Sequence, residues 1–217
     1  MPAFAVIIPA AGKSTRFGAN KLMQLLAGKP VLFHTTDAFR FREDVTHVII
    51  PMEGTIGGEK LSYCEGGASR AESVLNALRA VPSDIEWIAV HDAARPLVSQ
   101  GLIDRTFAAA LEHGAAVPAL PVHVTIKQAR GPLPAKADRT IPRDQLWAMQ
   151  TPQVMRRAAL LDAFERCPIP LDQVTDDAQL LELAGHEVWL VPGDEQNIKI
   201  TTPMDLKLAE LWLDPPK

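Results

Sequence analysis

Apolar runs alternate with amphipathic stretches along most of the chain. The apolar runs are rich in β-branched residues and predict strands at Ala5–Ile8, Val45–Pro51, Leu61–Cys64, Trp87–His91, Ala116–Leu120, Glu187–Val191 and Ile198–Ile200. The amphipathic stretches carry apolar residues at helical spacing and predict helices at Val31–Phe39, Arg70–Ala80, Leu102–His113, Ala158–Arg166, Asp177–Ala184 and Met204–Leu213. This order predicts an α/β fold with a doubly wound, mostly parallel sheet.

Two of the predicted helices also have recognisable start signals. Ser99 precedes the run that begins at Leu102, and Thr202 stands as a cap before Pro203 and Asp205.

One segment, residues 122–147, interrupts the alternation. It reads as two extended stretches around a turn at Gly131-Pro132-Leu133-Pro134, which predicts a β-hairpin. Two strands alone are marginally stable, so a hairpin needs support from its own body or from a second subunit. The other interpretation is a decorated surface loop.

Length and composition predict one soluble domain over residues 1–217, with residues 122–147 as an appended arm. The chain has 217 residues, of which 47% are hydrophobic, and this is enough to bury a sizeable core. The formal net charge of −4 argues against nucleic acid as a partner. No apolar run approaches the ~20 residues that span a bilayer, so no membrane association is expected.

Cysteine usage favours a cytoplasmic location. Cys64 and Cys167 lie far apart without C-x-x-C spacing, and the chain does not open on a basic and then apolar leader.

The first predicted turn combines small residues with cations. Pro9-Ala10-Ala11-Gly12-Lys13-Ser14-Thr15-Arg16 follows the first apolar run, and Lys21 lies close behind. Small side chains let backbone N–H groups approach an anion, and Arg16 and Lys21 can neutralise its charge. The turn indicates a polyphosphate site; an ordinary surface turn of similar composition is the alternative.

Gly12-Lys13-Ser14-Thr15 imitates the end of a P-loop. That motif, G-x-x-x-x-G-K-[ST], needs a glycine five positions before Gly12, where this chain has Ile7. A P-loop kinase is therefore excluded.

A second candidate site is the start of the helix predicted at Arg70. Gly66 and Gly67 lead into it and would let a flat base approach the backbone, while Ser69 or Ser73 can hydrogen-bond its polar edge. The alternative is an ordinary glycine turn with Ser69 as N-cap.

The motif His91-Asp92-Ala93-Ala94-Arg95-Pro96 ends a predicted strand, where open α/β sheets place their ligands. Asp92 can help to hold Mg²⁺ beside phosphates, directly or through water, and Arg95 can grip a phosphate. The alternative is an Asp92–Arg95 surface ion pair of little energetic value. His91 is interpreted as a packing residue with satisfied hydrogen bonds, because the histidines show no metal-ligand spacing.

Two further residues stand out in the last third of the chain. Thr175 precedes a predicted helix and is a natural N-cap. Lys199 lies between apolar residues of a predicted strand, a position that favours a cation aimed at the phosphate site.

The sequence shows no Ser–His–Asp or Cys–His set. A phosphate monoester has a second pKa near ~6 and is largely ionised at neutral pH, so as a nucleophile it needs no general base. Catalysis then consists of positioning and charge neutralisation by Arg16, Lys21, Lys199 and Mg²⁺.

In this order, the motifs resemble those of the 2-C-methyl-D-erythritol 4-phosphate cytidylyltransferase family, within the wider Rossmann-like fold of nucleotide-diphospho-sugar transferases. The resemblance spans almost the whole chain. Its landmarks are Pro9–Gly12 with Arg16 and Lys21, Gly66-Gly67 with Arg70 and Ser73, His91–Pro96, Leu146-Trp147 before Gln150–Gln153, Thr175–Ala178 and Asn197–Lys199.

The resemblance implies a nucleotidyltransferase that moves a cytidylyl group from CTP to 2-C-methyl-D-erythritol 4-phosphate in the non-mevalonate isoprenoid pathway, with Mg²⁺. The implied catalytic residues are Arg16, Lys21 and Lys199. The implied CTP-binding residues are Ala10, Ala11, Gly12, Gly67, Ser73, Asp92 and Ala93. The implied binding residues for the polyol phosphate are Arg95, Thr125, Arg143, Thr151 and Thr175.

The resemblance also implies a homodimer in which the hairpin arms are exchanged, so that Thr125 and Arg143 enter the site of the other subunit. The chain departs from the family pattern in this arm. The family usually has an acid before the threonine, whereas Val124 stands there in this chain.

Two alternatives remain. A D-ribitol 5-phosphate cytidylyltransferase shares most of the landmarks, and Val124 keeps that possibility open. A non-catalytic nucleotide-binding relative is disfavoured by the presence of Arg16, Lys21 and Lys199.

Overall fold

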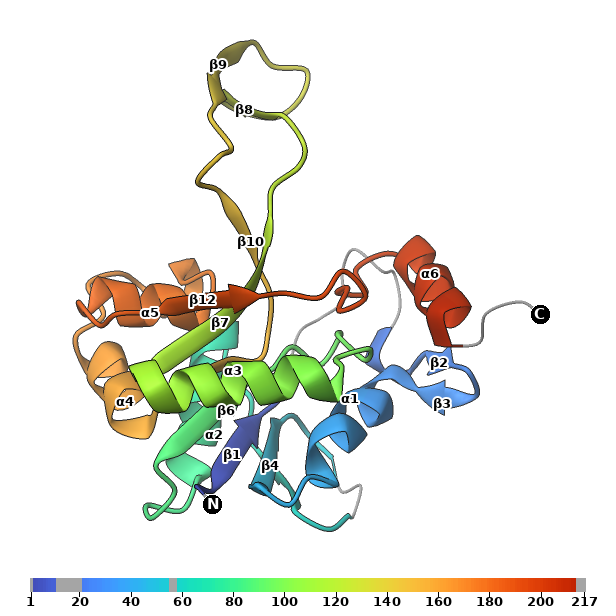
Figure 1. Ribbon diagram of the computed structural model, residues 1–217, viewed down its shortest axis with the longest axis vertical. Coiled ribbons are helices and arrows are strands. Elements are labelled where there is room, and N and C mark those ends of the chain that lie inside the picture. The colour runs from blue at the N-terminus through green and yellow to red at the C-terminus, as the bar shows by residue number, and fades with distance from the viewer. Residues whose placement is uncertain (1, 11–20, 55–57, 214–217) are drawn as a thin grey trace.

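The computed structural model describes residues 2–10, 21–54 and 58–213. Within them, eight strands form a central sheet in the order β10-β7-β11-β6-β1-β4-β5, with β12 also paired to β7 (Figure 1). The strands are β1 Phe4–Ile7, β4 Val45–Pro51, β5 Leu61–Cys64, β6 Trp87–Val90, β7 Ala115–Pro121, β10 Trp147–Met149, β11 Gln153–Arg156 and β12 Trp189–Pro192.

The sheet is mostly parallel, as expected. Strands β6, β1, β4 and β5 run parallel to one another, and β12 runs parallel to β7. Strand β11 is antiparallel to both β6 and β7, and β10 is antiparallel to β7.

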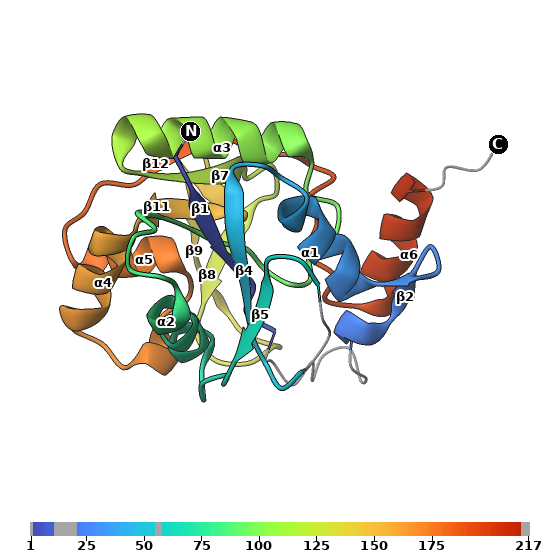
Figure 2. The same cartoon turned by 90° about the horizontal axis from the view of Figure 1, so that it is seen from below.

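Helices cover both faces of the sheet (Figure 2). The side chains of β1 alternate between these two faces and explain this arrangement. Phe4 and Val6 pack with residues of α1 and α3, whereas Ala5 and Ile7 pack with residues of α2, α4 and α5. The helices are α1 Val31–Arg40, α2 Arg70–Ala80, α3 Gln100–His113, α4 Arg157–Glu165, α5 Asp177–Leu183 and α6 Pro203–Leu213. The doubly wound arrangement is confirmed.

The predicted start signals at Ser99 and Thr202 are confirmed. The Ser99 side chain accepts a hydrogen bond from the backbone of Leu102 at the start of α3. The backbone N–H of Asp205 donates to Thr202 Oγ1 at the start of α6.

The predicted hairpin is also present and projects from the body of the molecule (Figure 1). Strands β8 (Ile126–Ala129) and β9 (Ala137–Ile141) form an antiparallel pair of their own, and most of their side chains are exposed. Its root is joined to the central sheet, since β10 pairs with the end of β7.

The strand predicted at Ile198–Ile200 is wrong. A turn precedes it, with the Asn197 N–H donating to the Asp194 carbonyl, and the Ile200 N–H then donates to the Ala94 carbonyl. The segment therefore lies against the loop after β6 and does not join a ladder of strands.

Several short elements were not predicted. They are β11, the pair β2 (Leu25–Leu26) and β3 (Lys29–Pro30), and the 3₁₀ turns η1 (Lys21–Met23) and η2 (Leu171–Gln173). Among the described residues, none of the helices is both long and apolar enough to span a bilayer.

Candidate active site

The predicted motifs converge where the parallel strands end. Ala10 follows β1 and is buried, while His91 and Asp92 follow the neighbouring strand β6. The backbone of His91 donates to the Ile7 carbonyl, so the loop after β6 starts in register with β1. This edge is the usual ligand position in open α/β sheets.

Asp92 lies at the centre of a cluster of three cations. Its Oδ2 is 2.9 Å from Lys199 Nζ and 3.3 Å from Arg95 Nε. Its Oδ1 is 3.5 Å from Arg70 Nε. The Asp92 and Arg95 side chains are each only 12% exposed, so the expected alternative of a weak surface ion pair does not apply.

The cations keep Asp92 ionised. Burial by itself would raise the pKa of this carboxyl, but Arg70, Lys199 and Arg95 outweigh it and hold the pKa far below its ordinary value. Conversely, burial lowers the pKa of Arg95, with only partial compensation from Asp92. The cluster thus combines a permanent anion with cations that can also face a phosphate.

A hydrogen-bonded frame holds the Lys199 segment beside Asp92. Arg95 Nη1 donates to the Asn197 carbonyl at 2.6 Å, and Asn197 Nδ2 donates to the Thr151 carbonyl at 2.8 Å. Gln150 Nε2 donates to the Asp194 carbonyl at 2.8 Å. Lys199 thus reaches Asp92 from a loop. The predicted phosphate site, at which the sequence aims this lysine, lies largely outside the described residues.

His91 is a packing residue, as expected. It is fully buried, and Nε2 lies 3.1 Å from the Arg95 carbonyl. Its Nδ1 lies 3.0 Å from Thr151 Oγ1, which also accepts a hydrogen bond from the Asp92 backbone. Burial lowers the pKa of His91 to about 4, so the ring is neutral at physiological pH. Thr151, a predicted substrate residue, thereby contacts the Asp92 loop.

The start of α2 is closely packed, and Ser69 is its N-cap, as the alternative interpretation of this motif expects. Ser69 caps the helix through the N–H of Glu72, whose side chain accepts from the Ser69 N–H in return. The Gly67 N–H donates to Ser73 Oγ at 3.0 Å. A Cβ on Gly67 would lie 2.3 Å from the Cβ of Glu72, so packing alone requires glycine here, whether or not a base binds.

The remaining predicted residues lie in several places. Ala93 is buried, and its carbonyl accepts a hydrogen bond from Thr35 of α1 at 2.9 Å. Lys21 begins η1 and is half-buried. Ala11, Gly12 and Arg16 lie outside the described residues.

Thr175 is not the N-cap of its helix, contrary to the prediction. Asp176 caps α5 by accepting from the Gln179 N–H, while exposed Thr175 donates from its hydroxyl to Gln179 Oε1. The helix begins one residue later than a Thr175 cap would require.

Thr125 and Arg143 are exposed on the arm, and Arg143 donates to the His123 carbonyl there. In the described part of the chain, the contacts of Arg143 thus lie within the arm. The structure does not bring these two residues into the Asp92 cluster of their own chain.

Sequence reasoning did not assign roles to Arg70 and Asp177. Arg70 Nη2 lies 2.8 Å from Oδ2 of Asp177, whose side chain is fully buried. Burial raises the pKa of Asp177 despite the neighbouring arginine. Both residues belong to landmarks of the family resemblance and lie at the starts of predicted helices, but neither signal reveals that the two side chains meet.

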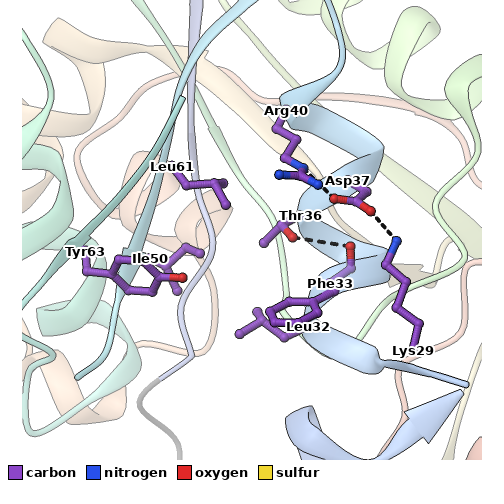
Figure 3. Close-up of a pocket in the computed structure, with 9 residues that line it drawn as sticks. All are labelled: Lys29, Leu32, Phe33, Thr36, Asp37, Arg40, Ile50, Leu61 and Tyr63. Carbon is purple, nitrogen blue, oxygen red and sulfur yellow. Dashed lines mark hydrogen bonds and ion pairs between the residues drawn. The ribbon is translucent and has the colours of Figure 1, made fainter. Parts of the chain in front are cut away.

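A separate pocket of ≈ 140 Å³ lies between α1 and strands β4 and β5 (Figure 3). Leu32, Phe33, Ile50, Leu61 and Tyr63 supply most of its apolar lining, and Asp37 pairs with Lys29 and Arg40 at its side. None of the predicted site residues that the structure describes lines this pocket.

The residues around Asp92 do not fit direct binding of Mg²⁺. Both carboxylate oxygens already face cations, and a Mg²⁺ site needs oxygen ligands around the ion. In the described ranges, no group of three or more His, Cys, Asp or Glu side chains is placed to hold a metal.

Comparison with known proteins identifies the family of this chain and agrees with its fold. The profile of the 2-C-methyl-D-erythritol 4-phosphate cytidylyltransferase family matches residues 4–215. The enzyme of that name from Dechloromonas aromatica is 40% identical over 98% of both chains. The chain is also 40% identical to a bifunctional IspD/IspF enzyme of Desulfotalea psychrophila, of which it spans 56%.

Solved structures give the same result. The crystal structure of the cytidylyltransferase of this name from Thermus thermophilus has a TM-score of 0.81 and 37% identity, with 98% of each chain covered. That from Francisella tularensis has a TM-score of 0.85 and 32% identity, covering 95% of this chain and 98% of its own. This chain therefore belongs to the 2-C-methyl-D-erythritol 4-phosphate cytidylyltransferase family.

Proposed function

We propose that this chain transfers the cytidylyl group of CTP to 2-C-methyl-D-erythritol 4-phosphate and releases pyrophosphate. The observation that carries the proposal is the buried Asp92, held among Arg70, Arg95 and Lys199 at the ligand-binding edge of the sheet. Family membership supports the reaction type, and the names of the relatives supply the acceptor.

The chemistry requires charge neutralisation more than proton transfer. An oxygen of the acceptor phosphate attacks the α-phosphorus of CTP, and the bond from that phosphorus to the bridging oxygen of pyrophosphate breaks. The attacking oxygen is already ionised near neutral pH, so no general base is needed. Arg16, Lys21 and Lys199 stabilise the negative charge that develops on the equatorial oxygens.

Asp92 prepares Lys199 for this role. The 2.9 Å ion pair orients the ammonium group before substrate binds, and Asp92 stays anionic under all ordinary conditions. Orientation in advance reduces the reorganisation that the transition state would otherwise require.

The two substrates bind to different parts of the sheet edge at which the parallel strands end. We assign CTP to Ala10, Ala11, Gly12, Gly67, Ser73, Asp92 and Ala93. We assign the acceptor to Arg95, Thr151 and Thr175, together with Thr125 and Arg143 of the partner subunit in a homodimer joined by the arms. The exposure of both arm residues supports the latter assignment.

In this proposal, the Mg²⁺ dependence expected from the sequence arises from the nucleotide substrate and not from a metal site of the protein. Mg²⁺ would enter with CTP as part of the substrate and would help to neutralise its phosphates, and Asp92 would not ligate it directly, because its oxygens already face cations. We further propose that the chain is a single catalytic domain, that it acts in the cytoplasm, and that it binds neither nucleic acid nor a membrane.

The test is release of pyrophosphate from CTP with Mg²⁺, with methylerythritol phosphate and D-ribitol 5-phosphate offered in parallel. We expect release with methylerythritol phosphate and at least tenfold less with ribitol phosphate. The reverse preference would assign the ribitol activity, for which Val124 on the arm is the one favouring feature.

A variant with Lys199→Met serves as the control for contaminating activity. It preserves the length of the side chain and removes the charge, so its release of pyrophosphate should fall to a small fraction of wild type. Absence of release by the wild-type protein with both acceptors would reject both transferases and leave the non-catalytic relative.

A further inference from the structure

Arg70 and Asp177 extend the cluster of ion pairs around Asp92. Arg70 contacts Asp177 through Nη2 at 2.8 Å and Asp92 through Nε at 3.5 Å. We propose that Asp177 and Arg70 are positioning residues, which fix the Asp92 carboxylate and thereby the placement of Lys199. This inference rests on the proposed function.

Asp177 is poorly explained by stability alone. It is fully buried as the first residue of α5, and its Oδ1 has no hydrogen-bond partner among the described residues. A buried carboxylate carries a desolvation cost that an apolar residue of similar size would avoid. The first turn of a helix accepts an acid on its surface without this cost. In its buried position, the Asp177 carboxylate instead forms an ion pair with the guanidinium of Arg70.

Arg70 is likewise in a place that does not favour a cation. It is the first residue of α2, where the helix dipole is positive. Burial alone would lower its pKa, but the carboxylates of Asp177 and Asp92 outweigh it and raise the pKa. Two anions, Asp92 on the loop after β6 and Asp177 at the start of α5, therefore hold this side chain in place.

The two oxygens of Asp92 face opposite ways. Oδ1 faces Arg70, and Oδ2 faces Arg95 and Lys199. Fixing Oδ1 sets the rotation of the carboxylate about its side-chain bond, and that rotation decides where Oδ2 presents itself to the Lys199 ammonium.

Asp177 limits how strongly Arg70 pulls on Asp92. Asp177 holds the Nη2 end of the guanidinium, and this contact keeps Nε at 3.5 Å from Oδ1. Without Asp177, Arg70 moves toward Asp92 and competes with Lys199 for it. Asp176 faces the same region but is engaged by Gln153 Nε2 at 2.8 Å.

The first test replaces Asp177 by Asn and measures kcat and the KM for CTP and for the acceptor. We expect kcat to fall at least tenfold, because small misplacements of a catalytic group are costly, while both KM values change by about twofold or less. Asp176→Asn is the matched control, since asparagine still caps α5 and the Arg70 contact remains. Its kcat should stay within about twofold of wild type.

A double-mutant cycle separates positioning from a general loss of structure. If Asp177 acts through Arg70, then Asp177→Asn should add little to the loss already caused by Arg70→Met. Losses that multiply in the double variant would overturn the proposal, as would a rise in KM at unchanged kcat.

Thermal unfolding of each variant shows whether it is folded. Should Asp177→Asn fail to fold, Arg70→Lys decides alone, because lysine keeps the charge but lacks the planar fork through which Arg70 contacts each carboxylate with a separate nitrogen. A tenfold lower kcat at unchanged KM supports the proposal, and an unchanged kcat overturns it. Inactive wild-type protein in the same assay would instead reject the proposed function.

Discussion

At the scale of single residues, His91 shows how the site depends on burial. The ring belongs to the residue before Asp92 and forms hydrogen bonds with Thr151 Oγ1 and with the Arg95 carbonyl. It also packs against Phe39, with ring centroids 4.9 Å apart. A neutral histidine therefore supports the loop that carries the charged residues.

This burial predicts a loss of stability in acid. Because the pKa of His91 is about 4 in the folded chain and 6.5 ordinarily, the unfolded chain takes up a proton first as the pH falls. The stabilisation present above pH 6.5 is then lost progressively, and the loss amounts to roughly 3 kcal/mol by pH 4.

Urea unfolding of the wild type and of His91→Gln, measured between pH 7.5 and pH 4, checks this expectation. The variant lacks the titrating group, so the difference in free energy of unfolding should shrink toward low pH. Parallel curves for the two proteins would contradict the assignment to His91.

The sequence was informative about residues whose neighbours are fixed by strand order. Asp92 and Arg95 follow a strand directly, so the rule for the carboxyl ends of parallel strands places them at the ligand edge. The meeting of Arg70 with Asp177 was not predictable in this way. It depends on how α2 and α5 pack on one face of the sheet, and hydrophobic periodicity does not specify that packing.

At the scale of elements, the start of α2 depends on a residue without a side chain. A Cβ at Gly67 would also lie 2.8 Å from the Ser73 backbone nitrogen, which is closer than real contacts allow. The helix start and the loop before it are therefore a single packed unit.

Gly67→Ala should accordingly lower the free energy of unfolding by about 1–3 kcal/mol, since the backbone of α2 must move to admit the methyl group. Gly101→Ala in α3 is the control. Its nearest neighbour would be Arg105 Nη1 at 3.9 Å, and alanine favours a helix, so this variant should be as stable as wild type or more so. Chemical denaturation of both variants measures the difference, and equal stability of the two would refute the close packing.

The errors of prediction at this scale have a common cause. Ile198–Ile200 has the apolar composition of a strand, yet its backbone bonds to a loop. Strand β11 has four residues, follows Pro152 and continues directly into α4, so it gives neither an alternating pattern nor a turn signal. In both segments, tertiary partners outweigh local pattern.

At the scale of the whole molecule, a single chain does not explain why the arm projects from the body. Most of it is exposed, and Val124, Leu133 and Trp147 present apolar surface at 67%, 86% and 50% exposure. Such a projection is consistent with the proposed exchange of arms between two subunits.

Mixing two impaired variants tests this exchange. Lys21→Ala damages the body of the site, and Arg143→Ala damages the arm. A heterodimer with exchanged arms contains one intact site, so an equimolar mixture that has been allowed to exchange subunits should regain about a quarter of wild-type activity. Each variant alone should remain weakly active. A mixture no more active than the average of its components, or a monomer in sedimentation, would contradict the exchange.

The reversed direction of β11 has a consequence for how this enzyme family can diversify. Because β11 runs against β6, Thr151, which lies just before β11, reaches the Asp92 loop although 59 positions separate the two in the sequence. Apart from Arg95, the residues proposed to bind the acceptor thus lie in the later half of the chain, whereas those proposed to bind the nucleotide lie in its earlier half. If the proposed assignment holds, substitutions at the acceptor residues of the later half would change the choice of polyol and leave the nucleotide contacts unchanged, so that one scaffold could acquire new acceptors in small steps.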